Sequence, residues 1–283
     1  YFLHEKESPS LSMRRIENGT SADEEVEVFD AYLLHEEELV NIGKTGRELY
    51  GESFSFSQSQ SITFKEKLLP GEVKFTANFA ALSPTASTFS VKYNNEIIGE
   101  ASINGSSNDY VFAVESTLNK DIILDKEDAP SFKINFNAKT SAKNAYLNYI
   151  RLVGQQEIAI NSDQGYTLFR NVKSLSSNLK YKIKEYSDSY AVWDITDPLS
   201  IKIQDIAEDN SFVSPDKGLK EYALVDLNGK NFPEVKIIGE IANQNLHAIE
   251  DIDMVIVSPS GLKASAQQLA DYRKSHDKMN VLV

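Results

Sequence analysis

Short runs in which apolar and polar residues alternate fill the middle of the chain, and they constrain the fold more than any other feature. A clear example is Val73–Phe79, where every second residue is apolar. This period of two is typical of a β-strand with one buried face. Similar runs lie at residues 54–56, 62–64, 89–93, 110–114 and 132–136. With no helical periodicity between them, they predict a jelly-roll-like β-sandwich over residues 25–175.

The segments on either side of this domain are predicted to differ from it. Residues 1–24 are polar and mixed, which predicts an extended N-terminal arm. Residues 176–250 contain further short apolar runs and predict a β connector. Trp193 lies in one of these runs, in the string W-D-I-T-D-P. We interpret it as a packing anchor in preference to a ligand platform.

The last residues, 251–283, change from β periodicity to a strand, a helix and a second strand. Met254–Val257 is a continuous apolar run, and Ser260 is predicted to cap the helix that follows Pro259. The helix is predicted from the spacing of Leu262, Ala266, Leu269, Tyr272 and His276. A lone βαβ unit cannot bury both faces of its sheet, so we expect it to be a truncated piece of a larger α/β domain.

Composition limits the classes of function. The chain has 283 residues, a formal net charge of −13 and no Cys. The acidic balance argues against nucleic acid as a partner, because phosphate binding needs concentrated Lys and Arg. Without Cys, the chain has no disulfide, thiolate metal site or cysteine nucleophile. No run approaches the roughly 18 apolar residues that a membrane helix needs.

Several strings, in order along the chain, resemble one family. They are G-R-E-L-Y-G-E at 46–52, Y-L-N-Y-I at 146–150, W-D-I-T-D-P at 193–198 and N-Q-N-L-H at 243–247. They resemble the N-terminal region of PorU-type proteins, and the closing strand and helix in residues 251–283 resemble the start of the gingipain-like α/β peptidase domain. PorU-type proteins are gingipain-like, sortase-like cysteine peptidases of the type IX secretion system of Bacteroidetes.

The resemblance implies a location and a set of partners. Family members cleave the sorting domain from secreted cargo at the outer face of the outer membrane, with His and Cys in a caspase-like α/β domain. Because this chain has no Cys, we expect it to be inactive by itself and to support its own C-terminal peptidase domain. Other expected partners are outer-membrane secretion components and cargo.

No residue is assigned a catalytic, cofactor-binding or metal-binding role, and no cofactor is expected. His4 and His35 lie near acidic residues, and His35 is interpreted as part of a solvated acidic turn. His247 is interpreted as fixing the linker, and His276 as lying near the helix C-terminus, where a cation is favoured. The acidic stretches 121–128 and 205–209 lack the spacing of a calcium loop and are predicted to be solvated.

Two further functions stay open. A jelly-roll domain rich in Tyr and Phe can present aromatic side chains to a glycan, which makes a carbohydrate-binding or adhesive surface module the main alternative. Most Phe residues occur in alternating strands, however, where they are predicted to fill the core. A purely structural interaction protein is the third possibility.

Overall fold

The computed structural model describes residues 13–44, 46, 48–55, 57–108, 110–140, 142, 144–230, 232, 234, 236–240 and 245–283. The chain forms two compact units, Tyr1–Phe232 and Pro233–Val283. His4, Arg47, Phe56 and two residues of the N-Q-N-L-H string, Asn243 and Gln244, lie outside the described residues.

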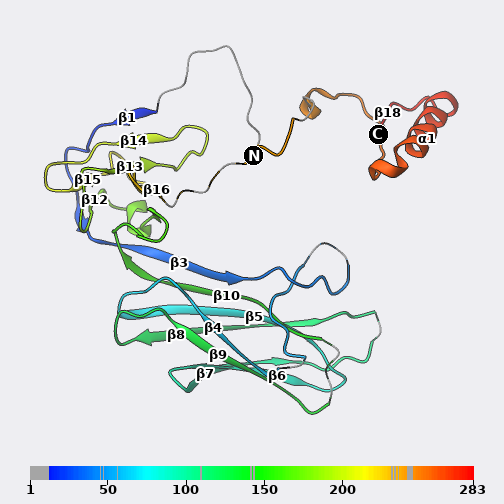
Figure 1. Cartoon of the computed structure of the whole chain (residues 1–283), viewed down its shortest axis with the longest axis horizontal. Coiled ribbons are helices and arrows are strands. Elements are labelled where there is room, and N and C mark those ends of the chain that lie inside the picture. The colour runs from blue at the N-terminus through cyan, green and yellow to red at the C-terminus, as the bar shows by residue number, and fades with distance from the viewer. Residues whose placement is uncertain are drawn as a thin grey trace. The chain divides into compact units, whose positions relative to one another are not determined.

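The first unit contains the predicted β-sandwich, built from two four-stranded antiparallel sheets (Figure 1). One sheet has the order β3 (Val28–Glu36), β10 (Asn144–Glu157), β5 (Gly71–Leu82) and β8 (Val114–Leu124). The other has the order β4 (Ser59–Thr63), β9 (Ser131–Ala138), β6 (Ser87–Tyr93) and β7 (Glu96–Ile103). Strands distant in sequence are neighbours in both sheets, as expected for a jelly-roll-like sandwich.

Phenylalanine side chains fill the space between the two sheets. Phe79 and Phe89 stack with ring centroids 4.5 Å apart, and Phe75 lies 4.8 Å from Phe132. All four are almost fully buried. They come from the alternating runs, since successive strand residues point to opposite faces of a sheet. The sequence therefore predicted correctly that most Phe residues belong to the core.

The turn between β6 and β7 is a hairpin. Asn94 and Asn95 both have positive φ, 49° and 67°. A two-residue hairpin turn with positive φ at both positions matches the right-handed twist of the flanking strands, and Asn tolerates that conformation. The predicted hairpin is confirmed.

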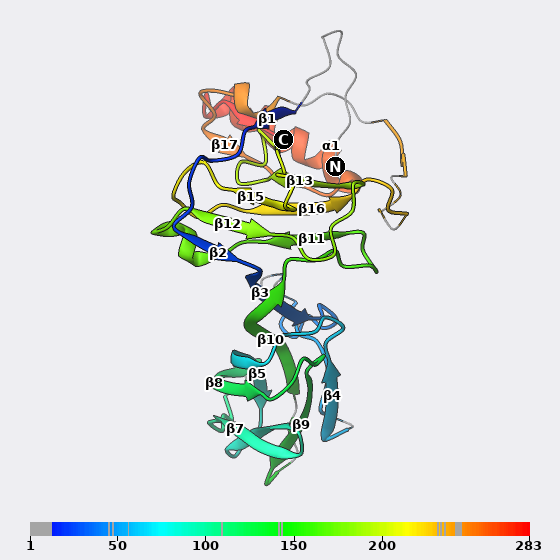
Figure 2. The ribbon, with the colours of Figure 1, turned by 90° about the vertical axis from the view of Figure 1, so that its left-hand side faces the viewer.

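Strands of the predicted connector, together with strands from outside it, form two smaller sheets beside the β3 end of the sandwich (Figure 2). The five-stranded sheet has the order β1 (Arg14–Ile16), β14 (Lys202–Gln204), β13 (Tyr190–Asp194), β16 (Tyr222–Asp226) and β11 (Tyr166–Phe169). The three-stranded sheet has the order β15 (Ser211–Val213), β12 (Leu179–Lys182) and β2 (Glu24–Val26). The short helix η1 (Val172–Leu175) follows β11.

Strand pairing links segments that the sequence analysis had separated. β1 lies in the predicted arm but pairs in parallel with β14, and β2 pairs in parallel with β12. β11 lies before residue 175 but pairs with β16 of the connector. Long-range pairing of this kind has no local sequence signal. The division at residues 24, 175 and 250 stays a prediction.

The second unit is the predicted βαβ unit. It contains η2 (Leu246–Ala248), β17 (Met254–Val255), η3 (Ser260–Leu262), α1 (Lys263–His276) and β18 (Val281–Leu282). β17 and β18 are parallel, with Met254 opposite Val281. Ile256 extends the ladder by donating its backbone N–H to the Leu282 carbonyl at 2.8 Å.

Two details of this unit differ from the predictions. Ser260 does not cap α1, because η3 intervenes and the helix begins at Lys263 with no side-chain cap. The predicted apolar face of α1 is only partly covered, since Leu269 and Tyr272 are 41% and 53% exposed. Only Ala266 is buried among the five residues that predicted the helix.

Candidate functional site

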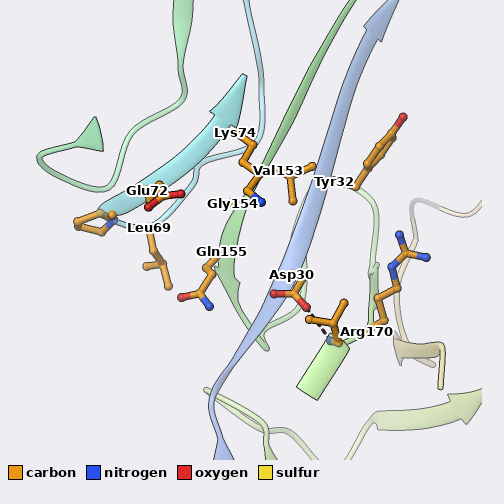
Figure 3. Close-up of a pocket in the computed structure, with 12 residues that line it drawn as sticks. Asp30, Tyr32, Leu69, Glu72, Lys74, Val153, Gly154, Gln155 and Arg170 are labelled. Atoms are coloured by element: carbon orange, nitrogen blue, oxygen red, sulfur yellow. Dashed lines mark hydrogen bonds between the residues drawn. The ribbon is translucent and has the colours of Figure 1, made fainter. Parts of the chain in front are cut away.

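A groove of about 560 Å³ lies between the sandwich and the segment that follows β11 (Figure 3). Its floor comes from the face of the β3–β10–β5–β8 sheet that points away from the Phe core, and the segment after β11 forms one wall. We call it the junction groove. The polar and aromatic side chains that line it are Asp30, Tyr32, Glu72, Lys74, Gln155 and Arg170.

Hydrogen bonds between β3 and the segment that follows β11 fix one side of the junction groove. The Asp30 carboxylate accepts the backbone N–H of Val172 at 2.7 Å, and the Asp30 backbone N–H donates to the Arg170 carbonyl at 3.1 Å. Arg170 is in turn paired with Glu221, with 3.0 Å between Nη1 and Oε1. The wall therefore needs no ligand to hold it in place.

The other polar side chains of the groove are free to form hydrogen bonds with a ligand. Among the described residues, the side chains of Tyr32, Glu72, Lys74 and Gln155 make no hydrogen bond or ion pair with one another or with neighbours. Tyr32 is 51% exposed. The groove thus offers an aromatic ring, a carboxylate, an ammonium group and an amide to a ligand.

The same face of the sheet continues beyond the groove as two polar rows. Arg151 lies opposite Thr76 on β5, and Thr76 lies opposite Asn119 on β8. The Thr76 hydroxyl donates to Asn119 at 2.9 Å and accepts from Arg151 at 3.3 Å. In the next row, Asn78 donates its amide to the Thr117 hydroxyl at 2.9 Å. These side chains hydrogen-bond to side chains of the neighbouring strands. Their positions on the sheet face are therefore fixed without a ligand.

Residues 48–52 of the first resembling string lie against the β3–β10–β5–β8 sheet. Glu48 accepts the amide of Asn148 at 2.7 Å, and the Tyr50 hydroxyl donates to Glu115 at 2.7 Å. The pKa of Tyr50 is raised above its ordinary value, mainly by burial and to a smaller extent by the hydrogen bond to Glu115. The segment therefore ties β10 and β8 together, which is a structural role.

His35 is not in a solvated acidic turn, and that interpretation is corrected. It lies on β3, and its Nε2 is 2.6 Å from Oε1 of Glu52. The hydrogen bond to Glu52 raises the pKa of His35 above its ordinary value, against the opposing effect of burial. Burial acts to raise the pKa of Glu52, but its hydrogen bonds with His35 and with its own backbone N–H hold the pKa below its ordinary value.

The remaining sequence candidates lie on separate elements. His247 lies in η2, whereas His276 ends α1, where its ring stacks on Tyr272 at 5.1 Å. Trp193 is partly buried on β13 and pairs with Ile203 and Ala223. Trp193 does not line the junction groove.

The acidic residues at both ends of the 205–209 stretch form ion pairs. Asp205 pairs with Arg15 at 2.9 Å, and Asp209 pairs with Lys180 at 2.7 Å. The hydrogen bonds from Lys180 and Ser211 lower the pKa of Asp209 to about 2. Within the described ranges, no group of three or more His, Asp or Glu side chains converges where a metal ion could bind. Nor does any described helix combine the length and apolar character needed to cross a bilayer.

The fold therefore defines a mostly β region with a jelly-roll-like sandwich that is followed in sequence by a βαβ unit. No protein-family model matches the chain, and no curated protein matches it either. Among solved structures, it is similar to dimeric latent PorU from Porphyromonas gingivalis, with 25% identity and a TM-score of 0.74. The match covers 96% of this chain and 27% of that chain. The resemblance to a PorU-type region is confirmed.

Two sandwich domains of other proteins also match. The CBM36-1 domain of a multidomain xylanase from the hindgut metagenome of Trinervitermes trinervoides is 13% identical, with a TM-score of 0.29, over 44% of this chain and 94% of that chain. A CBM35 from Cellvibrio japonicus is 12% identical, with a TM-score of 0.30, over 45% of this chain and 97% of that chain. At TM-scores this low, the similarity is not evidence about what the groove binds.

Proposed function

We propose that the chain is a non-catalytic support and interaction region of a gingipain-like cysteine peptidase of PorU type. In this proposal it acts at the cell surface, in type IX secretion, where the parent protein processes secreted cargo. The PorU match supports it, because this chain corresponds to 27% of that longer protein. Its own C-terminal peptidase domain is the first partner proposed.

The observation that carries the proposal is the incomplete covering of the βαβ unit. Val255 and Val257 are 60% and 93% exposed, although they belong to the apolar run Met254–Val257, which begins with β17. A parallel sheet is normally covered on both faces. Further strands and helices of a peptidase domain would cover these residues together with Leu269 and Tyr272.

A charge placed on this face tests the proposal. Leu269→Glu is expected to leave the folding of the chain itself nearly unchanged, because the side chain is already 41% exposed. In a protein that continues beyond Val283, the same change would place a carboxylate in the interface and prevent its folding or secretion. The measurement is the melting temperature and secreted yield of both lengths of protein.

Lys274→Glu provides the control, since it alters charge at another exposed position of α1. The proposal requires Leu269→Glu to harm only the longer protein and Lys274→Glu to harm neither. Equal tolerance of both changes in the longer protein would show that the peptidase domain does not cover this face.

A further inference from the structure

We propose that the junction groove and the sheet face beside it bind a neutral saccharide chain. This proposal assigns a ligand-binding role to the residues of the junction groove. The support function does not require such a role. The site lies wholly within the first unit, so it can act whether or not the βαβ unit is covered.

The available side chains suit hydroxyl groups. A sugar hydroxyl donates one hydrogen bond and accepts others, so a site that reads several hydroxyls needs both kinds of partner. The amide of Gln155 supplies a donor and an acceptor, Glu72 accepts, and Lys74 donates. All three line one groove and, within the described part of the chain, none has a side-chain partner that would have to be displaced.

The charge of the groove favours a neutral ligand over an anionic one. Asp30 and Glu72 balance Lys74 and Arg170, and Arg170 is already paired with Glu221. The formal net charge of −13 for the whole chain adds to the repulsion of anions. A phosphate or sulfate group would meet no concentrated positive charge here.

Tyr32 supplies the apolar contact. Its ring stands half exposed on the same sheet face, because Tyr32 and Lys74 both lie opposite Val153 in neighbouring strand pairs. An aromatic ring of Tyr is a rigid surface with a polar tip, which suits the C–H face of a pyranose next to hydroxyl contacts. The groove therefore combines stacking and hydrogen bonding.

The register explains why a chain of sugars is expected rather than a single one. The row through Val153 is followed along β10 by rows through Arg151 and Tyr149, which carry Thr76 and Asn78 on β5. Alternate strand residues lie about 6.8 Å apart on one face. Thr76 and Asn78 are each only 6% exposed, but Arg151 and Tyr149 are partly exposed, and Asn119 and Thr117 of β8, which lie opposite Thr76 and Asn78, are exposed. An extended ligand would meet these exposed polar groups in turn along the strands.

The test uses the whole chain on a printed array of neutral glycans and of sulfated and uronic-acid glycans. The neutral oligosaccharide that binds best is then titrated by calorimetry. We expect neutral glycans to bind, Tyr32→Ala to weaken the association about tenfold, and Gln155→Ala to weaken it severalfold. Both side chains line the groove surface, and unchanged melting curves will show that the variants fold.

Tyr110→Ala is the matched control, because Tyr110 is 91% exposed and does not line the groove. It should bind as the unaltered chain does. The proposal is overturned if no neutral glycan binds, if only sulfated or uronic-acid glycans bind, or if Tyr32→Ala and Gln155→Ala bind normally. Leu269→Glu should leave glycan binding unchanged, so failure of this proposal is distinct from failure of the support role.

Discussion

The sandwich and the βαβ unit differ in how far their apolar side chains are buried. In the sandwich, the alternating Phe residues are fully covered by the facing sheet. In the βαβ unit, Val257 and Tyr272 remain largely exposed and only Ala266 and Ala270 of α1 are buried. The comparison indicates that the sandwich is complete in itself, whereas the βαβ unit has apolar surface suited to further structure.

The largest difference is expected from a core substitution. Phe79→Ala removes a ring that is 0% exposed and stacked on Phe89. It should lower the free energy of unfolding of the first unit by about 3–5 kcal/mol. Urea denaturation followed by near-ultraviolet circular dichroism measures this loss. A loss below about 1 kcal/mol would show that the sandwich core is not closely packed.

A smaller difference is expected from two glycines, one in each unit. A Cβ on Gly51 would lie 3.0 Å from the Glu37 carbonyl oxygen, whereas a Cβ on Gly261 would have no atom within 4 Å. Gly51→Ala should destabilise its unit by about 1–3 kcal/mol because the neighbouring backbone must shift. Gly261→Ala should be nearly neutral. Equal melting temperatures for the two variants would contradict the close packing of the Gly46–Glu52 segment.

The His35–Glu52 pair should make the sandwich stability depend on pH. The raised pKa of His35 gives stability that is full below its unfolded value of 6.5 and is lost as pH rises through the folded pKa. The lowered pKa of Glu52 gives stability that is present above its unfolded value of 4.5 and is lost as pH falls through the folded pKa. The contribution of the pair should therefore be largest between these two limits.

The measurement is the difference in unfolding free energy between the chain and His35→Gln across that pH range. Because both side chains are partly exposed, the difference should be roughly 1 kcal/mol at its maximum. His276→Gln is the control, since His276 and Asp277 form a more exposed pair at the C-terminal end of α1. A pH-independent difference for His35→Gln would refute the ion pair.

The smallest effect is expected on the exposed face of α1. Leu269→Ala in the chain alone should change the free energy of unfolding by no more than about 0.5 kcal/mol, as for other surface positions. Hydrogen exchange of the α1 amides would report it without interference from the sandwich. A loss of several kcal/mol would mean that Leu269 is already packed, and the contrast between the two units would fail.

The sequence predicted the parts of the fold that local periodicity encodes. The run Val73–Phe79 marked a strand, Asn94 and Asn95 marked a hairpin, and the tail marked a βαβ unit. It did not predict that β1 and β2 would pair with the connector, because parallel pairing over long separations has no local signal.

The candidate site was harder to predict for the same reason. Asp30, Glu72, Gln155 and Arg170 meet only after β3, β5, β10 and the segment that follows β11 are assembled. His35 was assigned to a solvated turn because its neighbours in sequence are acidic. Its partner in the structure is Glu52, which folding brings to β3 from the resembling string. The spacing of these residues in the sequence predicts neither the junction groove nor the His35–Glu52 pair.

The most direct test of the support role is the reading frame that follows the codon for Val283. Our account predicts a long continuation that completes the α/β sheet and carries a His and, farther on, a Cys at strand ends. A stop codon close to Val283 would contradict it and would leave the β-sandwich and its junction groove as the functional part of the protein.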